Sequence, residues 1–573
     1  MKSIFGLWLF LLFFCASAYA QNLGDNYILE WKKFYPSQAL NEGMRTSVFN
    51  YENRSEEAIA KWLKFNESIL LELAKTDASI DAIDGRLVRV QAQSEVDKWK
   101  TLLEHTKSLG LYSDLISNAL PTLLKADYLL GNEKSKLLCD RLQAITNLAE
   151  AARTNLEKVS KKDLEKGVSD LKETRDYLQK ELKEKLEASG ILKTCDDFDD
   201  NVLKAIQSID ALKAFGETTL QKNTNESEAL LGRLEYNRRL AFYTDSNLTS
   251  KQLAEMALQE IQTVKGLMAE VSKEYISETY PGKNLPKNDL DIIEMALADM
   301  EKDAPLNATD YLQFWGTLAD EAVEFIMEKD IATLPKNNTL KIQTAPESAG
   351  AAAQIGWVAS APPFDPNPMT TLNLPSIPET LPKQEQIDFW ASFNKPFNRM
   401  IVIHELYPGH YMQLKISRET PHPIRLLFPY GIYIEGWATF TEKVLLDAGW
   451  EAGNHLTLLA HLRKRLENAN RAYTSAQVHC NSWDENQVMQ FSTETSLLAP
   501  QFAKSLWGRI MDSPIQITSY YLGGAQFTEL LAVEKQRLGE QFDLKFFMDT
   551  IMKAGPIPID EFYGIFENSK PNK

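Results

Sequence analysis

The segment HELYPGHYMQ at residues 404–413 constrains the fold most strongly, because its two histidines can bind the same metal ion only if the helix breaks between them. In the HExxH metal-binding pattern the histidines are four residues apart and share one helical face. His404 and His410 are six residues apart. An unbroken helix would therefore separate them by about 9 Å along its axis and by roughly 120° around it.

Pro408 and Gly409 lie between the two histidines and predict such a break. Proline lacks an amide hydrogen, clashes with the carbonyl four residues back and disfavours the α conformation at the preceding residue, whereas glycine accepts almost any conformation. We expect one helix over residues 398–407, a kink or π-type bulge at Pro408 and Gly409, and a second helix from His410 that turns its imidazole towards His404. The alternative is that the two residues only end a helix and that the histidines are ordinary polar residues.

The downstream segment YIEGWATFTE supplies a third candidate ligand, Glu435, twenty-five residues after His410. Two imidazoles and one carboxylate are the protein ligands of a common class of catalytic zinc site, in which a fourth position stays open. We therefore predict one Zn²⁺ ion bound by His404, His410 and Glu435. Glu442, seven residues further on the same helical face, can orient a ligand histidine. A solvated helix face is the alternative for both glutamates. Three other histidines of the region show no partner pattern and are predicted to be incidental: His422, His455 and His461.

Glu405 directly follows the first candidate ligand and is the predicted general base. A carboxylate beside a metal-activated water can accept a proton as the water attacks a carbonyl group. The resulting oxyanion needs a hydrogen-bond donor as well as the metal. The segment SYYLG at residues 519–523 offers two phenols, those of Tyr520 and Tyr521. The alternative for either tyrosine is a half-buried helical position with a locally satisfied hydroxyl.

Arg471 and His479 are eight residues apart, about two helical turns, so they can face the same side of one helix. Arg471 can pair bidentately with a substrate carboxylate, and His479 can stabilise a tetrahedral intermediate. Arg471 can equally bridge surface acids, and His479 can equally be a polar residue without a catalytic role.

These motifs resemble those of the bacterial proteins that carry domain of unknown function 885, in which HExxPGHxxQ is followed by EGWxxxxE. Softer similarity extends from LISNALPTLLKADYLL near residue 120 to FFMDTIMKAGPIPID near residue 550. The resemblance implies a two-lobed helical fold with a deep cleft, similar to that of zinc carboxypeptidases and angiotensin-converting-enzyme-like peptidases. It also favours Tyr520 over Tyr521 and gives Gln413 a role in substrate binding or ligand support. The matching residues are His404, Glu405, Pro408, Gly409, His410, Gln413, Glu435, Gly436, Trp437, Ala438 and Glu442.

Two positions depart from the pattern of this family. In the segment RAYTSAQVH, Arg471 and His479 match, but Ser475 stands where the family often has Asp. Near the C-terminus, Met548 stands where the family frequently has His. These departures leave the metal ligands intact and bear on substrate preference.

The fold class is predicted to be all-α with a small β element near the active site. Between about residues 55 and 275, apolar residues recur every three or four positions in segments rich in Leu, Ala, Glu and Lys. This pattern indicates long amphipathic helices. A turn-rich interval from Pro335 to Pro382 interrupts this pattern. Within it, Gly350 to Ser360 is a candidate edge strand that could pair with the main chain of a substrate. A surface connection is the alternative.

The N-terminus predicts export. Residues 1–20 combine an early Lys, an apolar core and small residues before a cut after Ala20, as in a signal peptide. A retained anchor is the alternative, and lipidation at Cys15 is disfavoured by the two phenylalanines before it. We expect a periplasmic or secreted protein with a mainly helical N-terminal region over 21–275 and a C-terminal catalytic region over 276–573 that contains the metal site. The two lobes can interleave.

The formal charge of −17 argues against nucleic acid or an anionic membrane surface as a partner. No membrane association is expected after signal cleavage, and the sequence leaves the oligomeric state open. The few cysteines provide neither a disulfide framework nor a thiolate zinc site. Cys139 and Cys195 can form one disulfide in an oxidising compartment, which their sequence separation does not decide.

Together these features predict an exported zinc-dependent peptidase that cleaves short peptides, as a carboxypeptidase or an oligopeptidase. Two alternatives remain open at this stage. One is a metal-dependent hydrolase of another amide or ester, and the other is a helical binding protein without catalytic activity.

Overall fold

The computed structural model describes residues 23–44, 51–75, 82–126, 129–191, 197–224, 230–337, 339–346, 349, 353–354, 356–366, 368–498 and 500–569. The expected signal peptide with its cut after Ala20, Cys195 of the expected disulfide and Gly350 of the expected edge strand lie outside these residues. The prediction of a mainly helical fold with a small β element is confirmed. Within the described residues, none of the helices combines the length and the apolar composition that crossing a membrane requires.

The chain forms two compact units, Met1–Ala229 with Pro362–Pro368 and Leu230–Ala361 with Met369–Lys573. The expected boundary between residues 275 and 276 instead falls inside helix α12 (Ser250–Thr279). The buried face of this helix packs in the core of the second unit. A division within α12 would expose that face, so the whole helix belongs to one unit.

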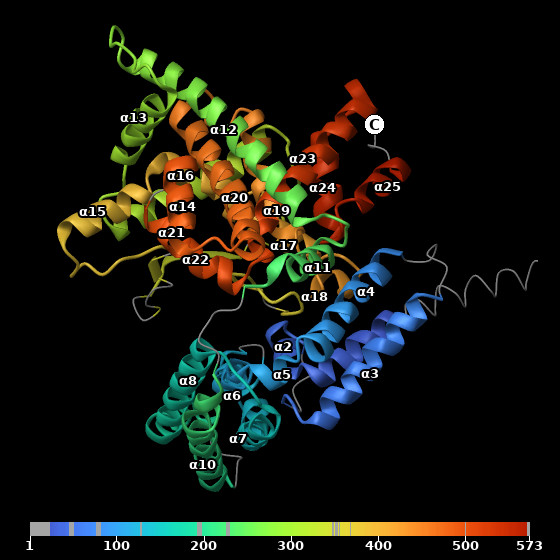
Figure 1. Cartoon of the computed structure of the whole chain (residues 1–573). Coiled ribbons are helices and arrows are strands. Elements are labelled where there is room, and N and C mark those ends of the chain that lie inside the picture. The colour runs from blue at the N-terminus through green and yellow to red at the C-terminus, as the bar shows by residue number, and fades with distance from the viewer. Residues whose placement is uncertain are drawn as a thin grey trace, which may run out of the picture. The chain divides into compact units, whose positions relative to one another are not determined.

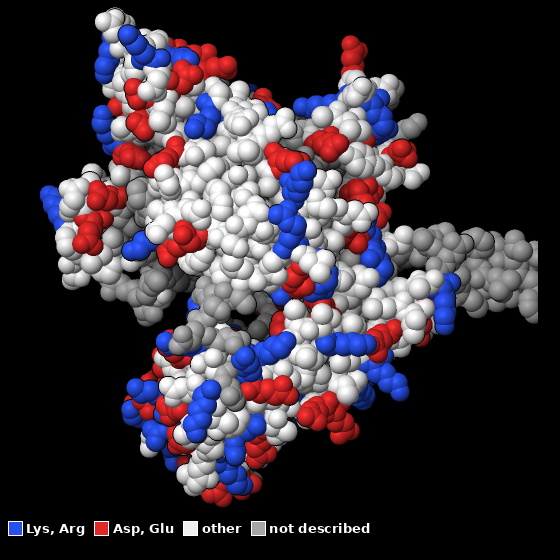
Figure 2. Space-filling view, in the orientation of Figure 1, with Lys and Arg blue, Asp and Glu red and all other residues white. Residues whose placement is uncertain are grey.

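The first unit is a set of amphipathic helices around an apolar core (Figure 1). Leu109, Leu142, Leu171 and Ile209, from four different helices, are fully buried in this core. On the outer faces of α8 and α10, Lys and Arg alternate with Asp and Glu (Figure 2). The helices are α2 (Pro36–Asn41), α3 (Glu56–Leu73), α4 (Ala82–Val96), α5 (Glu104–Lys107), α6 (Leu109–Lys125), α7 (Gly131–Asn155), α8 (Lys161–Lys180), α9 (Leu182–Ser189) and α10 (Phe198–Thr218).

The second unit is organised around the long helix α20 (His455–Asn481), which packs against α12, α16, α19 and α23. Figure 1 shows α19 and α20 side by side behind α12. This packing brings together helices that carry most of the predicted site residues. The remaining helices are α11 (Gly232–Thr244), α13 (Asp289–Lys302), α14 (Ala308–Glu328), α15 (Lys383–Ser392), α16 (Lys395–Glu405), α17 (His410–Ser417), α18 (Pro423–Leu427), α19 (Tyr433–Asp447), α21 (Glu485–Gln490), α22 (Pro500–Asp512), α23 (Ser519–Leu538), α24 (Leu544–Ala554) and α25 (Glu561–Asn568).

The turn-rich interval before the motif contributes a three-stranded sheet with the order β1-β3-β2. Strand β1 (Leu340–Thr344) runs parallel to β3 (Thr370–Leu374), and β2 (Trp357–Ala359) runs antiparallel to β3. The predicted edge strand corresponds in its described part to β2, which lies at one edge of the sheet. Substrate pairing with this edge stays a prediction.

Helices α19 and α23 cross with their main chains in contact at Gly436 and Gly523. A Cβ atom on Gly436 would lie 2.4 Å from the Cα atom of Gly523, and one on Gly523 would lie 2.1 Å from the carbonyl oxygen of Ile432. Only glycine allows the two helices to approach so closely. The crossing therefore fixes Glu435, on α19, relative to Tyr520, on α23.

We expect Gly436→Ala to lower the free energy of unfolding by about 1–3 kcal/mol or more, because the added methyl group must push two helices apart. Gly316→Ala is the matched control, since a Cβ atom there meets nothing within 4 Å in the middle of α14. That control should raise stability by about 0.5–1 kcal/mol, the usual gain from alanine in a helix. Urea denaturation of both variants measures the difference, and equal effects would contradict the close crossing.

Candidate metal centre

The helix breaks between the two motif histidines, as the sequence predicts. Helix α16 ends at Glu405 and α17 begins at His410. In the connecting turn the amide of Gly409 donates to the carbonyl of Ile403 at 3.0 Å, and the amide of Met412 donates to the carbonyl of Leu406 at 3.1 Å. Both hydrogen bonds span six residues instead of the four of an α-helix. The widened turn absorbs the two extra residues of the motif, and the first helix ends two residues earlier than expected.

Gly409 is required at this turn because the main chain leaves no room for a side chain. A Cβ atom at this position would lie 1.9 Å from the carbonyl oxygen of His404. The indole of Trp437 donates a hydrogen bond of 2.9 Å to the carbonyl oxygen of Pro408. The turn is thus held from α19, the helix that also carries Glu435.

His404, His410 and Glu435 converge as one cluster, and one ligand atom from each lies within 4.8 Å of the others. The Oε2 atom of Glu435 is 3.3 Å from Nε2 of His410 and 3.7 Å from Nε2 of His404. In a tetrahedral zinc site with ligand bonds of about 2.0–2.2 Å, neighbouring ligand atoms lie roughly 3.3–3.6 Å apart. The two distances from Glu435 lie in or close to this range, so the three side chains are placed where they could share one metal ion.

The hydrogen bonding and the ionisation of Glu435 also fit those of a metal ligand. Its Oε2 atom is buried and has no hydrogen-bond partner of normal geometry among the residues that the structure describes. Burial raises the pKa of Glu435, but the imidazoles of His404 and His410 outweigh this effect and hold the pKa well below its usual range. The cluster thus holds an ionised carboxylate oxygen that a cation would satisfy.

Glu442 supports the cluster from behind through two hydrogen bonds. Its Oε1 atom is 2.8 Å from Nδ1 of His404, and its Oε2 atom is 2.9 Å from Nδ1 of His461. Burial raises the pKa of Glu442, but the hydrogen bonds with His404 and His461 lower it to about 2. An ionised Glu442 accepts from His404 Nδ1–H, which leaves Nε2 of that ring available to a metal ion.

His461 is the residue that the sequence analysis missed. The expectation that it is incidental is wrong, since its imidazole is buried and shares the carboxylate of Glu442 with His404. It lies on α20, nineteen residues after Glu442, and no periodic spacing links the two. In contrast, the imidazole of His455 pairs with the exposed side chain of Glu278.

Glu405 is the last residue of α16 and lies directly beside the ligand cluster in the chain. Burial lowers the pKa of His404, but Glu435, Glu442 and Glu405 together raise it to about 10. The carboxylate of Glu405 is therefore close enough to act on a ligand imidazole. This position is compatible with the predicted role of a base.

Tyr520 lies beside the cluster and between two arginines. Burial and the charge of Glu435 raise its pKa to about 12, so the hydroxyl stays protonated and can donate a hydrogen bond. The guanidinium of Arg471 lies 4.8 Å from the centre of the Tyr520 ring, and Nη2 of Arg509 lies 3.5 Å from its hydroxyl. Tyr243, from α11, is also within electrostatic reach of Glu435 and Tyr520. Sequence spacing gave no signal for Arg509 or Tyr243.

The other predicted residues occupy distinct places. Arg471 is held by Glu467 and donates to Oδ1 of Asn468. Tyr521 faces Glu260 and Arg465, and burial followed by the charge of Glu260 raises its pKa to about 12.

Gln413 supports the second helix of the motif. It is fully buried, and its Nε2 donates a hydrogen bond of 2.8 Å to the hydroxyl of Ser417. Ser417 in turn donates to the carbonyl of Met552 on α24. This arrangement anchors α17 and favours the ligand-supporting role for Gln413.

The hydrogen bonds of His479 in the described part of the chain do not link it to the cluster. The amide of Leu231 donates to its Nδ1 atom at 3.3 Å, and its Nε2 atom lies 3.2 Å from the carbonyl oxygen of Ile510. The ring also stacks on Tyr236. Both ring nitrogens are engaged by main chain, which favours the structural reading of this residue over the catalytic one.

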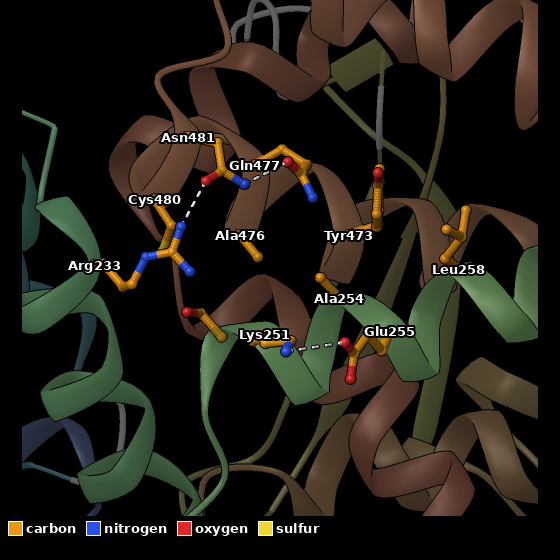
Figure 3. Close-up of a pocket in the computed structure, with 11 residues that line it drawn as sticks. Arg233, Lys251, Ala254, Glu255, Leu258, Tyr473, Ala476, Gln477, Cys480 and Asn481 are labelled. Carbon is orange, nitrogen blue, oxygen red and sulfur yellow. Dashed lines mark hydrogen bonds and ion pairs between the residues drawn. The ribbon is translucent and has the colours of Figure 1, made fainter.

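Two of the cavities among the described residues of the second unit bear on the candidate site. One, of about 230 Å³, lies between α12 and the end of α20 and contains none of the predicted site residues (Figure 3). Its polar side chains largely pair with one another, as Arg233 does with Asn481 and Asn481 with Gln477. The other, of about 400 Å³, is lined by Tyr520, Tyr521 and His461.

The fold and the cluster define a mainly helical protein with a candidate centre for one metal ion. The chain belongs to the family of bacterial proteins of unknown function DUF885, whose model matches residues 36–562. No curated protein resembles the chain closely enough to count as a match.

Two solved structures share the fold. One is a protein from Shewanella oneidensis described as a candidate lipoprotein of unknown function, with a TM-score of 0.78, 21% identity and coverage of 95% of this chain and 99% of the other. The second, from Colwellia psychrerythraea, is also described as a candidate lipoprotein, with a TM-score of 0.71, 17% identity and coverage of 96% and 100%. At these identities the likeness shows the fold alone.

We expect His461→Phe to weaken zinc binding by roughly 10- to 100-fold, the usual cost of losing a group that orients a metal ligand. The phenyl ring keeps the volume but leaves Oε2 of Glu442 without its donor. His461→Asn, whose amide can donate from a similar position, should restore part of the affinity. Competition with a chromophoric chelator measures the change, with His455→Phe as the control. Affinity equal to wild type in His461→Phe would contradict the role of Glu442 as a shared support.

Glu467 provides a test of pH dependence away from the ligands. Burial raises its pKa, but Arg471 and Lys464 lower it from 4.5 to about 2. Because the folded-state pKa is depressed, the ion pairs stabilise the fold fully above pH 4.5 and this contribution is lost as the pH falls towards 2. The shift corresponds to at most about 3 kcal/mol.

We therefore expect Glu467→Gln to lower the free energy of unfolding by up to about 3 kcal/mol at pH 7. The difference in the free energy of unfolding between the variant and the wild type should become smaller between pH 4.5 and pH 3. Urea denaturation at several pH values measures this gap. Glu270→Gln, at an exposed position of α12, is the control and should show no such narrowing. A gap that stays constant down to pH 3 would show that Glu467 does not have a depressed pKa.

Proposed function

We propose that this chain is an exported zinc-dependent hydrolase that cleaves peptide bonds of short peptides, as a carboxypeptidase or an oligopeptidase does. The observation that carries the proposal is the convergence of His404, His410 and Glu435 at distances that fit one zinc ion. Glu405 next to this cluster adds the carboxylate that hydrolysis requires. A purely structural zinc site would instead be closed by four protein ligands.

The two histidines and Glu435 would hold the ion, which supplies a Lewis acid for a carbonyl group and for water. Glu405 accepts the proton of the attacking water, and the same carboxyl group can deliver it to the leaving nitrogen. The hydroxyl of Tyr520 donates a hydrogen bond to the oxyanion as it forms. Its raised pKa keeps that proton on the phenol at neutral pH.

Arg471 has a supporting role in this proposal. Its guanidinium stacks on the ring of Tyr520 and is itself held by Glu467 and Asn468. This arrangement orients the phenol. It also places a positive charge beside the substrate, which favours peptides with a nearby carboxylate.

Hydrolysis of another amide or ester is the alternative, because the same groups attack any activated carbonyl. A helical binding protein without catalytic activity is the second alternative. The complete set of ligands, base and phenol favours a hydrolase over a binding protein.

The proposal includes export. Residues 1–20 have the pattern of a signal peptide. The two proteins of similar fold are described as candidate lipoproteins, a class that is carried across the inner membrane. We propose that the protein is periplasmic or secreted once the signal peptide has been cleaved after Ala20.

We expect Glu405→Gln to bind zinc as the wild type does and to cleave a broad peptide library at least about 100-fold more slowly, since a positioned general base contributes on that order. Metal content by mass spectrometry and cleavage by peptide mass analysis are measured on the same preparations. Glu419→Gln, at an exposed position after α17, is the matched control and should keep full activity.

Two results would overturn the proposal. A Glu405→Gln variant as active as the wild type would remove Glu405 from the role of base. A folded wild-type protein that binds no zinc would remove the hydrolase function altogether.

A further inference from the structure

A cavity of about 400 Å³ lies among helices α12, α19, α20 and α23, next to the candidate metal centre. Tyr520 lines this cavity and is close enough to Glu435 for the carboxylate to raise its pKa. His461 also lines it and is linked to the ligand His404 through the carboxylate of Glu442. The cavity is therefore connected to the candidate metal centre through Tyr520 and through the pair of His461 and Glu442.

Three buried polar atoms of the cavity lining have no hydrogen-bond partner among the described residues. They are Nε2 of His461, Nδ2 of Asn468 and Oγ1 of Thr439. The exposed fractions of these side chains are 3%, 2% and 9%. Buried polar atoms are rarely left unpaired, because an unpaired one has lost its hydrogen bonds to water without replacement. Three of them around a single cavity indicate a ligand that binds them together.

The hydrogen-bonding character of the three atoms follows from their other contacts. Oδ1 of Asn468 accepts from Arg471, so Nδ2 is a donor to the cavity. Nδ1 of His461 donates to Glu442, so in the neutral imidazole Nε2 is an acceptor. The hydroxyl of Thr439 can donate. The lining thus offers two donors and one acceptor.

The two basic residues that line the cavity are already paired with acids. Arg465 binds Glu260 at 2.7 Å, and Lys443 binds Asp447 at 2.7 Å. These ion pairs neutralise both basic residues, and the other charged residue of the lining, Glu529, is exposed to solvent. The buried part of the lining therefore has no unpaired charge that would select an anion or a cation. The remaining lining includes the apolar side chain of Phe440. An uncharged polar group at the end of an aliphatic or aromatic stem therefore fits the cavity.

We propose that this cavity binds the primary carboxamide of a substrate side chain of the glutamine or asparagine type. The carbonyl oxygen accepts from Asn468 Nδ2 and Thr439 Oγ1, and the amide nitrogen donates to His461 Nε2. Because Tyr520 borders both the cavity and the metal centre, the side chain belongs to a residue next to the bond that is cleaved. The substrate role rests on the proposed hydrolase function, whereas binding of the carboxamide does not.

The cavity of Figure 3 does not support a similar proposal. There Arg233 donates to Asn481, Asn481 donates to Gln477, and Lys251 pairs with Glu255. Most of its polar groups satisfy one another, so they do not define a ligand.

The test uses three end-blocked probes that differ only in the side chain: the N-acetyl methylamides of glutamine, glutamate and methionine. Their affinities for the mature full-length protein are measured by calorimetry, with zinc bound and after its removal. We expect the glutamine probe to bind roughly tenfold more tightly than the other two in both states, as expected for one or two well-formed hydrogen bonds.

Three variants assign this preference to the cavity. Thr439→Val and Asn468→Asp, which keep the side-chain shape but remove a donor, should each reduce the affinity for the glutamine probe by roughly fivefold or more. Thr528→Val is the matched control, because Thr528 lines the same cavity but its hydroxyl already donates to the carbonyl of Gly524 at 2.7 Å. This control should keep the wild-type affinity.

The outcomes separate this proposal from the hydrolase proposal. Equal binding of the three probes, or an equal loss in Thr528→Val, would overturn the carboxamide site even if peptides are cleaved. A glutamine preference that survives zinc removal would support the site even if no peptide is cleaved. If peptides are cleaved, enrichment of Gln or Asn beside the cleaved bond supports the substrate role, and its absence overturns that role.

Discussion

The candidate metal centre depends on the widened turn between α16 and α17. Two main-chain hydrogen bonds that span six residues, from Gly409 to Ile403 and from Met412 to Leu406, bring His410 back beside His404. The carbonyl oxygen of His404 occupies the space that any side chain at position 409 would need. The convergence of the two imidazoles is therefore a property of the main chain, and the side chains of α19 only reinforce it.

Glu442 extends this centre into the interior of the second unit. An ionised carboxylate in a fully buried position is costly, and the two imidazole donors from His404 and His461 offset that cost. The same pair of hydrogen bonds fixes the ring orientation of a metal ligand and joins α16, α19 and α20. It also links the centre to the cavity, because His461 is one of the residues that line it.

The sequence predicted the parts of this arrangement that depend on local chemistry. The helix break follows from Pro408 and Gly409, and Glu442 faces His404 because seven residues return to the same helical face as Glu435. The sequence did not reveal His461, because its partner lies on another helix and only tertiary packing brings the two together. For His479 the spacing predicted a helix face, but it could not reveal the main chain of Leu231 and Ile510 that binds both ring nitrogens. The two compact units divide before α11 and not near residue 275, because α12 packs against α20, about 200 residues later in the chain.

The glycine crossing of α19 and α23 has a mechanical consequence. Because main chain meets main chain at Gly436 and Gly523, there is no layer of side chains between the helices that could shift or change rotamer. A metal ligand and the phenol of Tyr520 therefore belong to one stiff body. Any change in the shape of the site must therefore come from elements outside this helix crossing, such as the strands that precede the motif.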